Sequence, residues 1–297
     1  MKGVLTLLTF IGFLSGQIRA GTLLSGISTL DVMNGVKAVR FRKTPEIITA
    51  LVKGEVDLAV IPAEMAAKLY LDGHEITIVA ADMFQNQAIL SLEIKTPHDL
   101  RGKTVAALLS SGTYMTFKSY MKEVYRLSAG RDFTVINAPP GALPDILMKG
   151  DADAIVAWEP LVSIVLSKGG HIVTDFTHLW KKLGYQGDPV MLLWVTSPRF
   201  KDSRSIDEFL KLRKRAARFW IENADSTVKT LVRLYNFDED LARRIYSRVK
   251  IYPGSLDKRM EENIKLVWKI AWKGGYLKRD PTVIPMSIFY RPQAGSY

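Results

Sequence analysis

The sequence predicts an α/β fold of two similar lobes around a central cleft, and three observations support this prediction. Apolar runs of strand length alternate with helical patterns, which is typical of parallel sheets covered by helices on both faces. A ten-residue segment occurs twice. The chain has 297 residues, of which 47% are hydrophobic, so it is long enough to bury two modest cores.

The repeated segment covers residues 51–60 and 147–156. Its glycine and its aspartate, Gly54 and Asp57 in the first copy, recur with the same displacement of 96 residues. Each copy predicts a helix that ends at a glycine with positive φ, an acidic turn and a short buried strand. Such a turn is common by itself, but the spacing and the flanking elements favour a pseudo-symmetric pair of lobes.

The elements around the two copies follow from the same patterns. We expect strands at 36–41, 57–61, 76–80, 104–108, 133–137, 153–157 and 171–173, and helices at 111–127, 142–149 and 160–168. The runs 88–93 and 190–196 are candidates for two strands that cross between the lobes. Lobe 1 would then comprise residues 1–90 and 193–297, and lobe 2 residues 91–192.

Two helix starts and the C-terminal part complete this prediction. Thr44 caps a helix with Pro45 at its first position, and Ser205 with Glu208 forms a capping box. The chain from Ser197 onward is predicted to be helical and to pack back on the first lobe. Three of its aromatic residues are expected in the core: Trp220, Trp268 and Trp272.

The N-terminus allows two interpretations. Lys2 followed by apolar residues 4–14 and then Ile18-Arg19-Ala20 resembles a secretory signal with its cleavage site. Alternatively, residues 4–10 form a buried first strand, Ser15 caps a helix that runs from Gly16, and Asn34-Gly35 makes the next turn. We favour the strand, in which case an export signal would lie upstream of Met1 or be absent. The apolar run is too short for a membrane span.

The composition of the chain limits the classes of partner that it is expected to bind. The net charge of +11 favours an anionic partner. The basic run 211–218 alternates with apolar residues as a solvated amphipathic helix does, so we do not expect nucleic-acid binding. There is no cysteine, and the four histidines are scattered, so neither a thiolate nor a zinc site is expected. No metal or cofactor is predicted.

Three stretches together resemble the extracytoplasmic solute-binding proteins of ABC importers for nitrate, sulfonate, taurine and thiamine-precursor ligands. The resemblance extends over residues 36–196, and its stretches are 51–60, Asp99 to Ala106 with Ser110 to Thr113, and Asp153 to Pro160. It implies the two-lobed type II periplasmic-binding fold, no catalysis and delivery of ligand to a membrane permease. Ser15-Gly16-Gln17 stand where the family has a proline-bearing helix start, and a lipid-attachment cysteine is missing, which leaves ligand class and localisation open.

The candidate site lies beyond the carboxyl ends of the strands, where ligands bind in parallel α/β sheets. The loop that begins helix 111–127 offers hydroxyls and unpaired backbone N–H groups to an anion, and we favour ligand contact there over the alternative of a plain helix cap. Trp158 would stack on a ligand or simply pack, Glu159 would accept from a ligand or cap a helix, and Glu64 would suit an amine or pyrimidine donor. Asn86 lies beside these candidates. The predicted ligand-binding residues are Ser15, Gly16, Gln17, Glu64, Gln85, Ser110, Ser111, Gly112, Thr113, Tyr114, Trp158 and Glu159.

These observations predict a monomeric solute-binding protein that closes on a small polar, anionic or zwitterionic organic solute and presents it to an ABC permease. The candidate ligand classes are sulfonate, nitrate and thiamine precursor. We expect an extracytoplasmic location, at the periplasm or cell surface, with the cytoplasm as the alternative. The rival function is a cytoplasmic enzyme of the same fold, of the menaquinone-biosynthesis or pyrimidine-synthase type. No catalytic constellation is evident in the sequence, which disfavours that rival.

Overall fold

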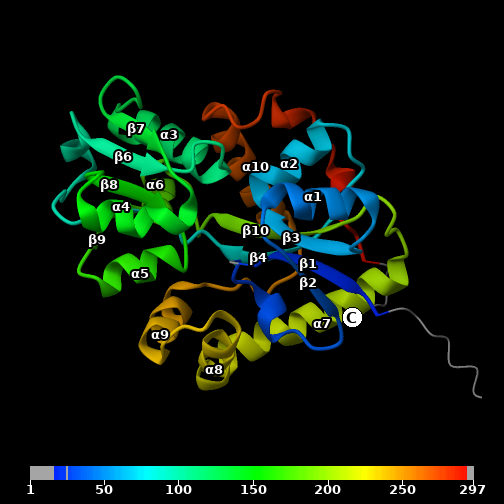
Figure 1. Ribbon diagram of the computed structural model, residues 1–297. Coiled ribbons are helices and arrows are strands. Elements are labelled where there is room, and N and C mark those ends of the chain that lie inside the picture. Colours follow the sequence, from blue (N-terminus) through cyan, green and yellow to red (C-terminus); the bar gives the residue numbers. More distant parts are fainter. Residues whose placement is uncertain (1–16, 25, 293–297) are drawn as a thin grey trace, which may run out of the picture.

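Two five-stranded sheets, each covered by helices, form two lobes that lie side by side (Figure 1). The computed structural model describes residues 17–24 and 26–292. The predicted two-lobed α/β fold is confirmed. In these parts of the chain, none of the helices combines the length and the apolar character that crossing a membrane requires.

The first sheet has the strand order β2-β1-β3-β10-β4. β1 pairs in parallel with β2 and β3, and β10 lies antiparallel between β3 and β4. Most of the residues of β3, β4 and β10 are buried, because helices cover both faces, which explains their continuous apolar sequences. The bounds are Arg19–Leu23 for β1, Lys37–Phe41 for β2, Leu58–Pro62 for β3, Ile78–Phe84 for β4 and Val190–Thr196 for β10.

The second sheet repeats this arrangement in the order β7-β6-β8-β5-β9. β6 pairs in parallel with β7 and β8, and β5 lies antiparallel between β8 and β9. Each strand therefore has a counterpart at the same position of the first sheet. The bounds are Ala88–Ser91 for β5, Thr104–Ala107 for β6, Thr134–Asn137 for β7, Ala154–Ala157 for β8 and His171–Asp175 for β9.

The two runs expected to cross between the lobes are strands, but neither bridges the sheets. β5 is an antiparallel member of the second sheet and β10 of the first. The chain instead passes from one sheet to the other through residues 85–87, and returns through the segment that follows α6 (Phe176–Lys182). These two short connections are therefore the only covalent links between the sheets within the described residues.

The repeated aspartates make the same contacts in both lobes. The carboxylate of Asp57 accepts from the backbone N–H of Arg19 at 2.7 Å, and that of Asp153 accepts from the N–H of Thr104 at 2.8 Å. In each lobe the backbone N–H of the aspartate also donates to the backbone carbonyl of its partner, which is Arg19 in the first lobe and Thr104 in the second. Each aspartate thus ties the starts of two neighbouring parallel strands together, β3 to β1 in the first lobe and β8 to β6 in the second, which explains why the segment occurs twice.

The glycines of the repeat end two helices as predicted. α1 (Thr44–Lys53) ends at Gly54 with φ of 73°, and α4 (Leu143–Lys149) ends at Gly150 with φ of 76°. Both values lie in the left-handed region, which glycine enters without a steric penalty. The predicted positive φ at the end of each repeated helix is confirmed.

Two predicted helix caps are wrong: one differs from the observed cap by one residue and the other by three residues. Thr44 is the first residue of α1 and not its cap, because the Glu46 carboxylate already accepts from the backbone N–H of Lys43. α7 (Ser203–Glu222) begins before the predicted box at Ser205, because the carboxylate of Asp202 accepts from the Ser205 N–H at 2.9 Å. In both cases a carboxylate satisfies the free amides one turn away from the expected residue.

The predicted helix from Gly16 onward is wrong. Arg19–Leu23 is β1, in parallel register with β2 and anchored by Asp57. Gly21 suits this central position, because a Cβ there would lie 3.3 Å from a methyl group of Val56. A cut after Ala20 would fall inside β1. The predicted strand at residues 4–10 lies outside the described residues.

The C-terminal helices pack on the first lobe and also reach the second. They are α8 (Ala224–Tyr235), α9 (Glu239–Arg248) and α10 (Lys258–Lys273), which follow α7. α10 packs against α2 (Ala63–Leu71) of the first lobe and α3 (Gly112–Tyr125) of the second, and α9 packs against α5 (Leu161–Ser167). Trp220 and Trp268 are buried as predicted, whereas Trp272 is 37% exposed, which contradicts its predicted place in the core.

Candidate ligand-binding cleft

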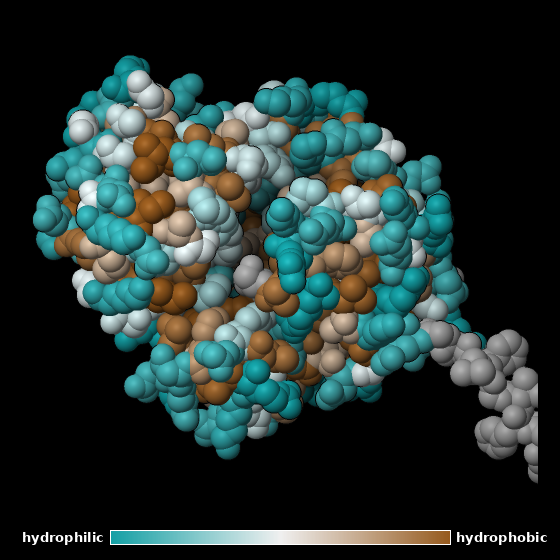
Figure 2. All heavy atoms as spheres, viewed as in Figure 1, coloured by the Kyte–Doolittle hydropathy of each residue, from teal (hydrophilic) through white to brown (hydrophobic). Residues whose placement is uncertain are grey.

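The starts of α2 and α3, one from each lobe, face each other between the two sheets. α2 follows β3 directly at Ala63, and α3 follows β6 after the loop 108–111. Figure 2 shows that the molecular surface is hollowed between the two lobes. Both helices therefore begin at the carboxyl ends of interior strands, the place where ligands bind in sheets of this kind.

The start of α3 combines a capped amide with uncapped ones. Ser111 is the cap: its Oγ accepts from the Tyr114 N–H at 3.1 Å and donates to the Leu108 carbonyl at 2.7 Å. Gly112 and Thr113 are buried, and their backbone N–H groups have no acceptor among the residues that the structure describes. Ser110 is exposed. The first turn thus leaves two donors for a ligand, next to the positive end of the helix dipole.

Glu64 of the first lobe lies against Gly112 of the second. A Cβ placed on Gly112 would be 1.9 Å from Oε1 of Glu64 and 2.5 Å from its Cγ and Cδ. Only a glycine therefore allows the two helices to approach this closely. The contact joins two of the predicted site residues that are 48 positions apart in the sequence.

The environment of Glu64 favours its protonated form. The residue is 8% exposed, and burial raises the pKa of its carboxyl to about 7. Burial, together with the nearby charges of Tyr185 and Glu64, also raises the pKa of Tyr120 well above its ordinary value. The Tyr120 hydroxyl is buried and has no hydrogen-bond partner in the described part of the chain. Burial in apolar surroundings, and not an ion pair, therefore determines which protonation state Glu64 adopts.

Glu159 is held by three groups from three parts of the chain. Its carboxylate accepts from the side chain of Arg248 in α9 and from the backbone N–H of Ser163. Its own backbone N–H donates to the side-chain oxygen of Asn86 at 3.2 Å. Burial raises the pKa of Glu159, and the charge of Arg248 opposes that shift. This arrangement supports the capping role that the sequence left open and pairs the carboxylate with a cation.

The two amide residues of the first connection are also fixed. Gln85 donates from its backbone to the Pro189 carbonyl at 2.8 Å, which joins the two connections between the sheets. Its side-chain oxygen is buried without a partner within the described residues. Asn86 reaches Glu159 as described above. Both residues therefore lie at the junction of the lobes, where the sequence placed them.

Two of the remaining predicted site residues lie at the cleft, and one does not. Trp158 is half-buried at the end of β8, beside Glu159, and Tyr114 is buried in the first turn of α3. Gln17 is exposed and precedes the amino end of β1, so the prediction that put it at the carboxyl edge of the sheet is wrong. Ser15 and Gly16 lie outside the described residues.

Sequence reasoning missed Arg248. It lies 89 positions after Glu159, on a helix that was assigned only to packing. Nothing local in the sequence marks an arginine at the end of an amphipathic helix as a partner for a carboxylate in the other lobe. The described residues contain no group of three or more His, Asp or Glu side chains that would hold a metal ion.

Comparison with known proteins identifies the family. Residues 35–227 match the family described as NMT1/THI5 like, which is more than half of the chain. The chain belongs to the NMT1/THI5-like family. This confirms the resemblance found in the sequence. No protein of curated function matches the chain.

Solved structures show the same fold in this NMT1/THI5-like protein and its neighbours. The periplasmic aliphatic sulphonate binding protein SsuA from Escherichia coli is 16% identical, with a TM-score of 0.77 over 94% of this chain and 93% of that one. The alkanesulfonate-binding protein SsuA from Xanthomonas axonopodis pv. citri, bound to MOPS, is 18% identical, with a TM-score of 0.74 over 93% and 98%. The periplasmic nitrate-binding protein NrtA from Synechocystis PCC 6803 is 15% identical, with a TM-score of 0.67 over 88% and 82%.

Proposed function

We propose that this NMT1/THI5-like protein is the solute-binding component of an ABC importer and that it holds a small organic anion or zwitterion between its lobes. The observation that carries the proposal is the meeting of α2 and α3 at Glu64 and Gly112. A ligand between these helix starts would contact both lobes at once, and such a ligand favours closure by its differential affinity for the closed state.

The charges around the cleft support an anionic group on the ligand. The backbone N–H groups of Gly112 and Thr113 lie at the positive end of a 14-residue helix. Glu159 does not oppose an anion, because Arg248 neutralises it. With a pKa of about 7, Glu64 is protonated in a large fraction of molecules at neutral pH, and its acid form donates a hydrogen bond instead of repelling the ligand.

The similar structures support the same class of ligand. Two are named for sulfonate binding and one for nitrate binding, and all three ligands are anions. We extend this chemistry to the present chain only as far as its own donors do. The ligand is therefore proposed to carry a compact anionic group that the start of α3 receives, with Trp158 packed against the rest of the molecule.

The importer role sets the expected location and partners. We propose that the protein works outside the cytoplasm as a monomer and that a membrane permease recognises its closed form. Lobe movement would occur at residues 85–87 and in the segment before β10, which are the short connections between the sheets. An epitope-tagged, full-length gene product found in the cytoplasmic fraction of its source cells would contradict this location.

Native mass spectrometry of the purified protein tests the function directly. We expect one unaltered small molecule per chain, released on denaturation and identified as an organic anion or zwitterion. A turnover product or a tightly held cofactor would instead support an enzyme. Any released solute is then titrated back while small-angle X-ray scattering follows the radius of gyration, which should decrease on binding.

Two variants test the cleft as the location of that solute. Thr113→Val removes the hydroxyl in the first turn of α3, and Trp158→Ala removes the aromatic surface beside Glu159. Each should weaken binding of the released solute by about tenfold, the effect of about 1.4 kcal/mol, while far-ultraviolet circular dichroism stays unchanged. Trp272→Ala is the matched control, since Trp272 is a partly exposed tryptophan outside the cleft. Unchanged affinity in both cleft variants would exclude this location.

A further inference from the structure

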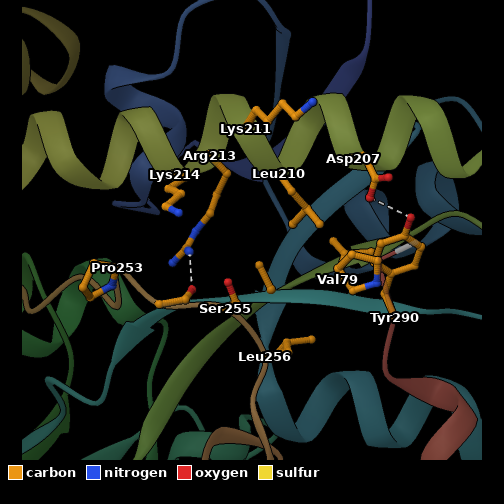
Figure 3. Close-up of a pocket in the computed structure, with 13 residues that line it drawn as sticks. Val79, Asp207, Leu210, Lys211, Arg213, Lys214, Pro253, Ser255, Leu256 and Tyr290 are labelled. Carbon is orange, nitrogen blue, oxygen red and sulfur yellow. Dashed lines mark hydrogen bonds between the residues drawn. The ribbon is translucent and has the colours of Figure 1, made fainter. Parts of the chain in front are cut away.

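A second cavity lies on the first lobe, away from the cleft. It has a volume of about 170 Å³ and is bounded by α7, β4, the segment 253–256 and the chain near Tyr290 (Figure 3). Apolar side chains form much of its wall, among them Val79, Leu210 and Leu256. None of its lining residues belongs to the predicted cleft site.

Arg213 of α7 gives this cavity a buried cation. The residue is 3% exposed, and its guanidinium donates to the backbone carbonyls of Ala81, Tyr252 and Gly254. All three acceptors are neutral. Its Nε is buried and has no partner among the described residues. An arginine is not deprotonated in a protein, so Arg213 places a buried positive charge in the wall of the cavity.

The nearby carboxylates do not pair with Arg213. Asp82 is fully buried and accepts from Thr29 and from the indole of Trp194, so its charge acts on Arg213 only through space. Asp207 lines the cavity but accepts from the Tyr290 hydroxyl at 2.8 Å. The guanidinium therefore lacks the direct carboxylate partner that usually accompanies a buried cation.

Lys214 adds a second positive charge on the same side. Figure 3 shows Arg213 and Lys214 extending from α7 toward the segment 253–256, and Lys211 also lines the cavity. Neither Lys211 nor Lys214 forms an ion pair with a described residue. Two cations beside an apolar wall match a molecule with one anionic group and an apolar body.

The volume limits the size of that molecule. An apolar cavity of about 150 Å³ is large enough to hold benzene, and this one is slightly larger and partly open. We propose that the cavity binds a small organic monoanion with an apolar body, of the size of benzoate, at a site separate from the cleft. The anionic group would contact Arg213 and Lys214, and the apolar body would pack against Val79, Leu210 and Leu256.

Isothermal titration calorimetry of the full chain with benzoate tests the proposal, with benzamide as the uncharged counterpart. We expect benzoate to bind at one site per chain and benzamide to bind at least tenfold more weakly, since hydrogen bonds to a charged group are the stronger ones. Absence of benzoate binding, or equal affinity for the two compounds, overturns the proposal.

Three variants locate the binding. Because Arg213 also holds three backbone carbonyls, the test uses its neighbours. Leu210→Trp fills the cavity and should abolish benzoate binding while the solute retained by the cleft remains in native mass spectra. Lys214→Gln should weaken benzoate binding by about threefold, and Lys229→Gln, the matched charge change at an exposed position of α8 outside the cavity, should not. Equal effects of the two lysine variants overturn the proposal, as does binding that survives in Leu210→Trp but is lost in Trp158→Ala.

Discussion

Oε1 of Glu64 lies where a side chain on Gly112 would have to be, so a glycine in one lobe and a carboxyl group in the other form a single contact. A Cβ on Gly112 would come within 1.9 Å of that oxygen. The contact places the start of α3 against the start of α2, and it depends on residue 112 having no side chain. The distance between the lobes therefore depends on two residues that lie far apart in the sequence.

Gly112→Ala should hold the lobes apart. The methyl group cannot share space with Glu64, and the buried carboxyl has to move, so the closed form becomes less favourable. We expect a larger radius of gyration by small-angle X-ray scattering and at least tenfold weaker binding of the solute that the purified protein releases. Gly141→Ala is the control, because a Cβ there meets nothing within 4 Å. Identical scattering and affinity in the two variants would show that the contact does not govern closure.

Glu64 should make stability depend on pH. Its carboxyl has an ordinary pKa of 4.5 in the unfolded chain and about 7 in the folded protein, so the folded state binds the proton more tightly between these values. Its contribution to stability is fully present below pH 4.5 and is lost as pH rises through 7, by about 3 kcal/mol in total. Urea unfolding of the wild type and Glu64→Gln at pH 5 and pH 8 measures this.

The difference between the two proteins isolates Glu64 from every other titrating group. We expect Glu64→Gln to gain stability relative to the wild type as pH rises from 5 to 8. A difference that stays constant over this range would contradict a buried, protonated Glu64.

Removing only Arg248 from its ion pair with Glu159 should destabilise the protein. Arg248→Met leaves the buried carboxylate of Glu159 without its cation, which should lower the free energy of unfolding by about 3 kcal/mol. Adding Glu159→Gln should restore part of this loss, because the uncompensated charge is gone. A double-mutant cycle by urea denaturation gives the coupling.

Lys273→Met is the control for that cycle. It breaks the exposed pair of Lys273 with Glu123, which also joins the lobes, and should cost less than about 1 kcal/mol. Equal losses of unfolding free energy in Arg248→Met and Lys273→Met would mean that burial of the Arg248–Glu159 pair does not increase its contribution to stability.

The repeated aspartates should both stabilise their lobes. Asp57→Ala leaves the backbone N–H of Arg19 without its acceptor and should cost about 2 kcal/mol, and Asp153→Ala, which is more exposed, about 1 kcal/mol. Asp151→Ala, in the same turn but without a side-chain partner in the described structure, should change stability by less than about 0.5 kcal/mol. Thermal unfolding with circular dichroism compares the three, and equal effects would show that the backbone contacts contribute little.

Local patterns were sufficient for most of the fold. The repeat of residues 51–60 correctly predicted two lobes, two positive-φ glycines and two buried strands, because helix ends and strand burial depend on neighbouring residues. The same reasoning failed over residues 17–23. There the strand Arg19–Leu23 is short and polar at its start, and its pairing with β2, β3 and Asp57 outweighs the helical pattern.

The candidate site was predictable in part. The loop at Ser111 and Gly112 and the position of Glu64 follow from the rule that ligands bind beyond the carboxyl ends of strands. The partner of Glu159 does not follow from that rule, because Arg248 reaches it from a helix of the C-terminal part. Gln17 was placed wrongly because a helix was predicted from Gly16 onward, whereas Gln17 precedes the amino end of β1.

The sequence by itself determined the two-lobed α/β class, the repeated helix-to-strand turn and the residues at the start of α3, since each depends on order and spacing along the chain. Only the tertiary structure decided that Glu64 meets Gly112, that Arg248 neutralises Glu159 and that Arg213 borders a cavity. The reason is physical: burial and the distance between charges depend on how segments far apart in the chain pack, and packing sets both the pKa of a carboxyl group and the partner available to a cation.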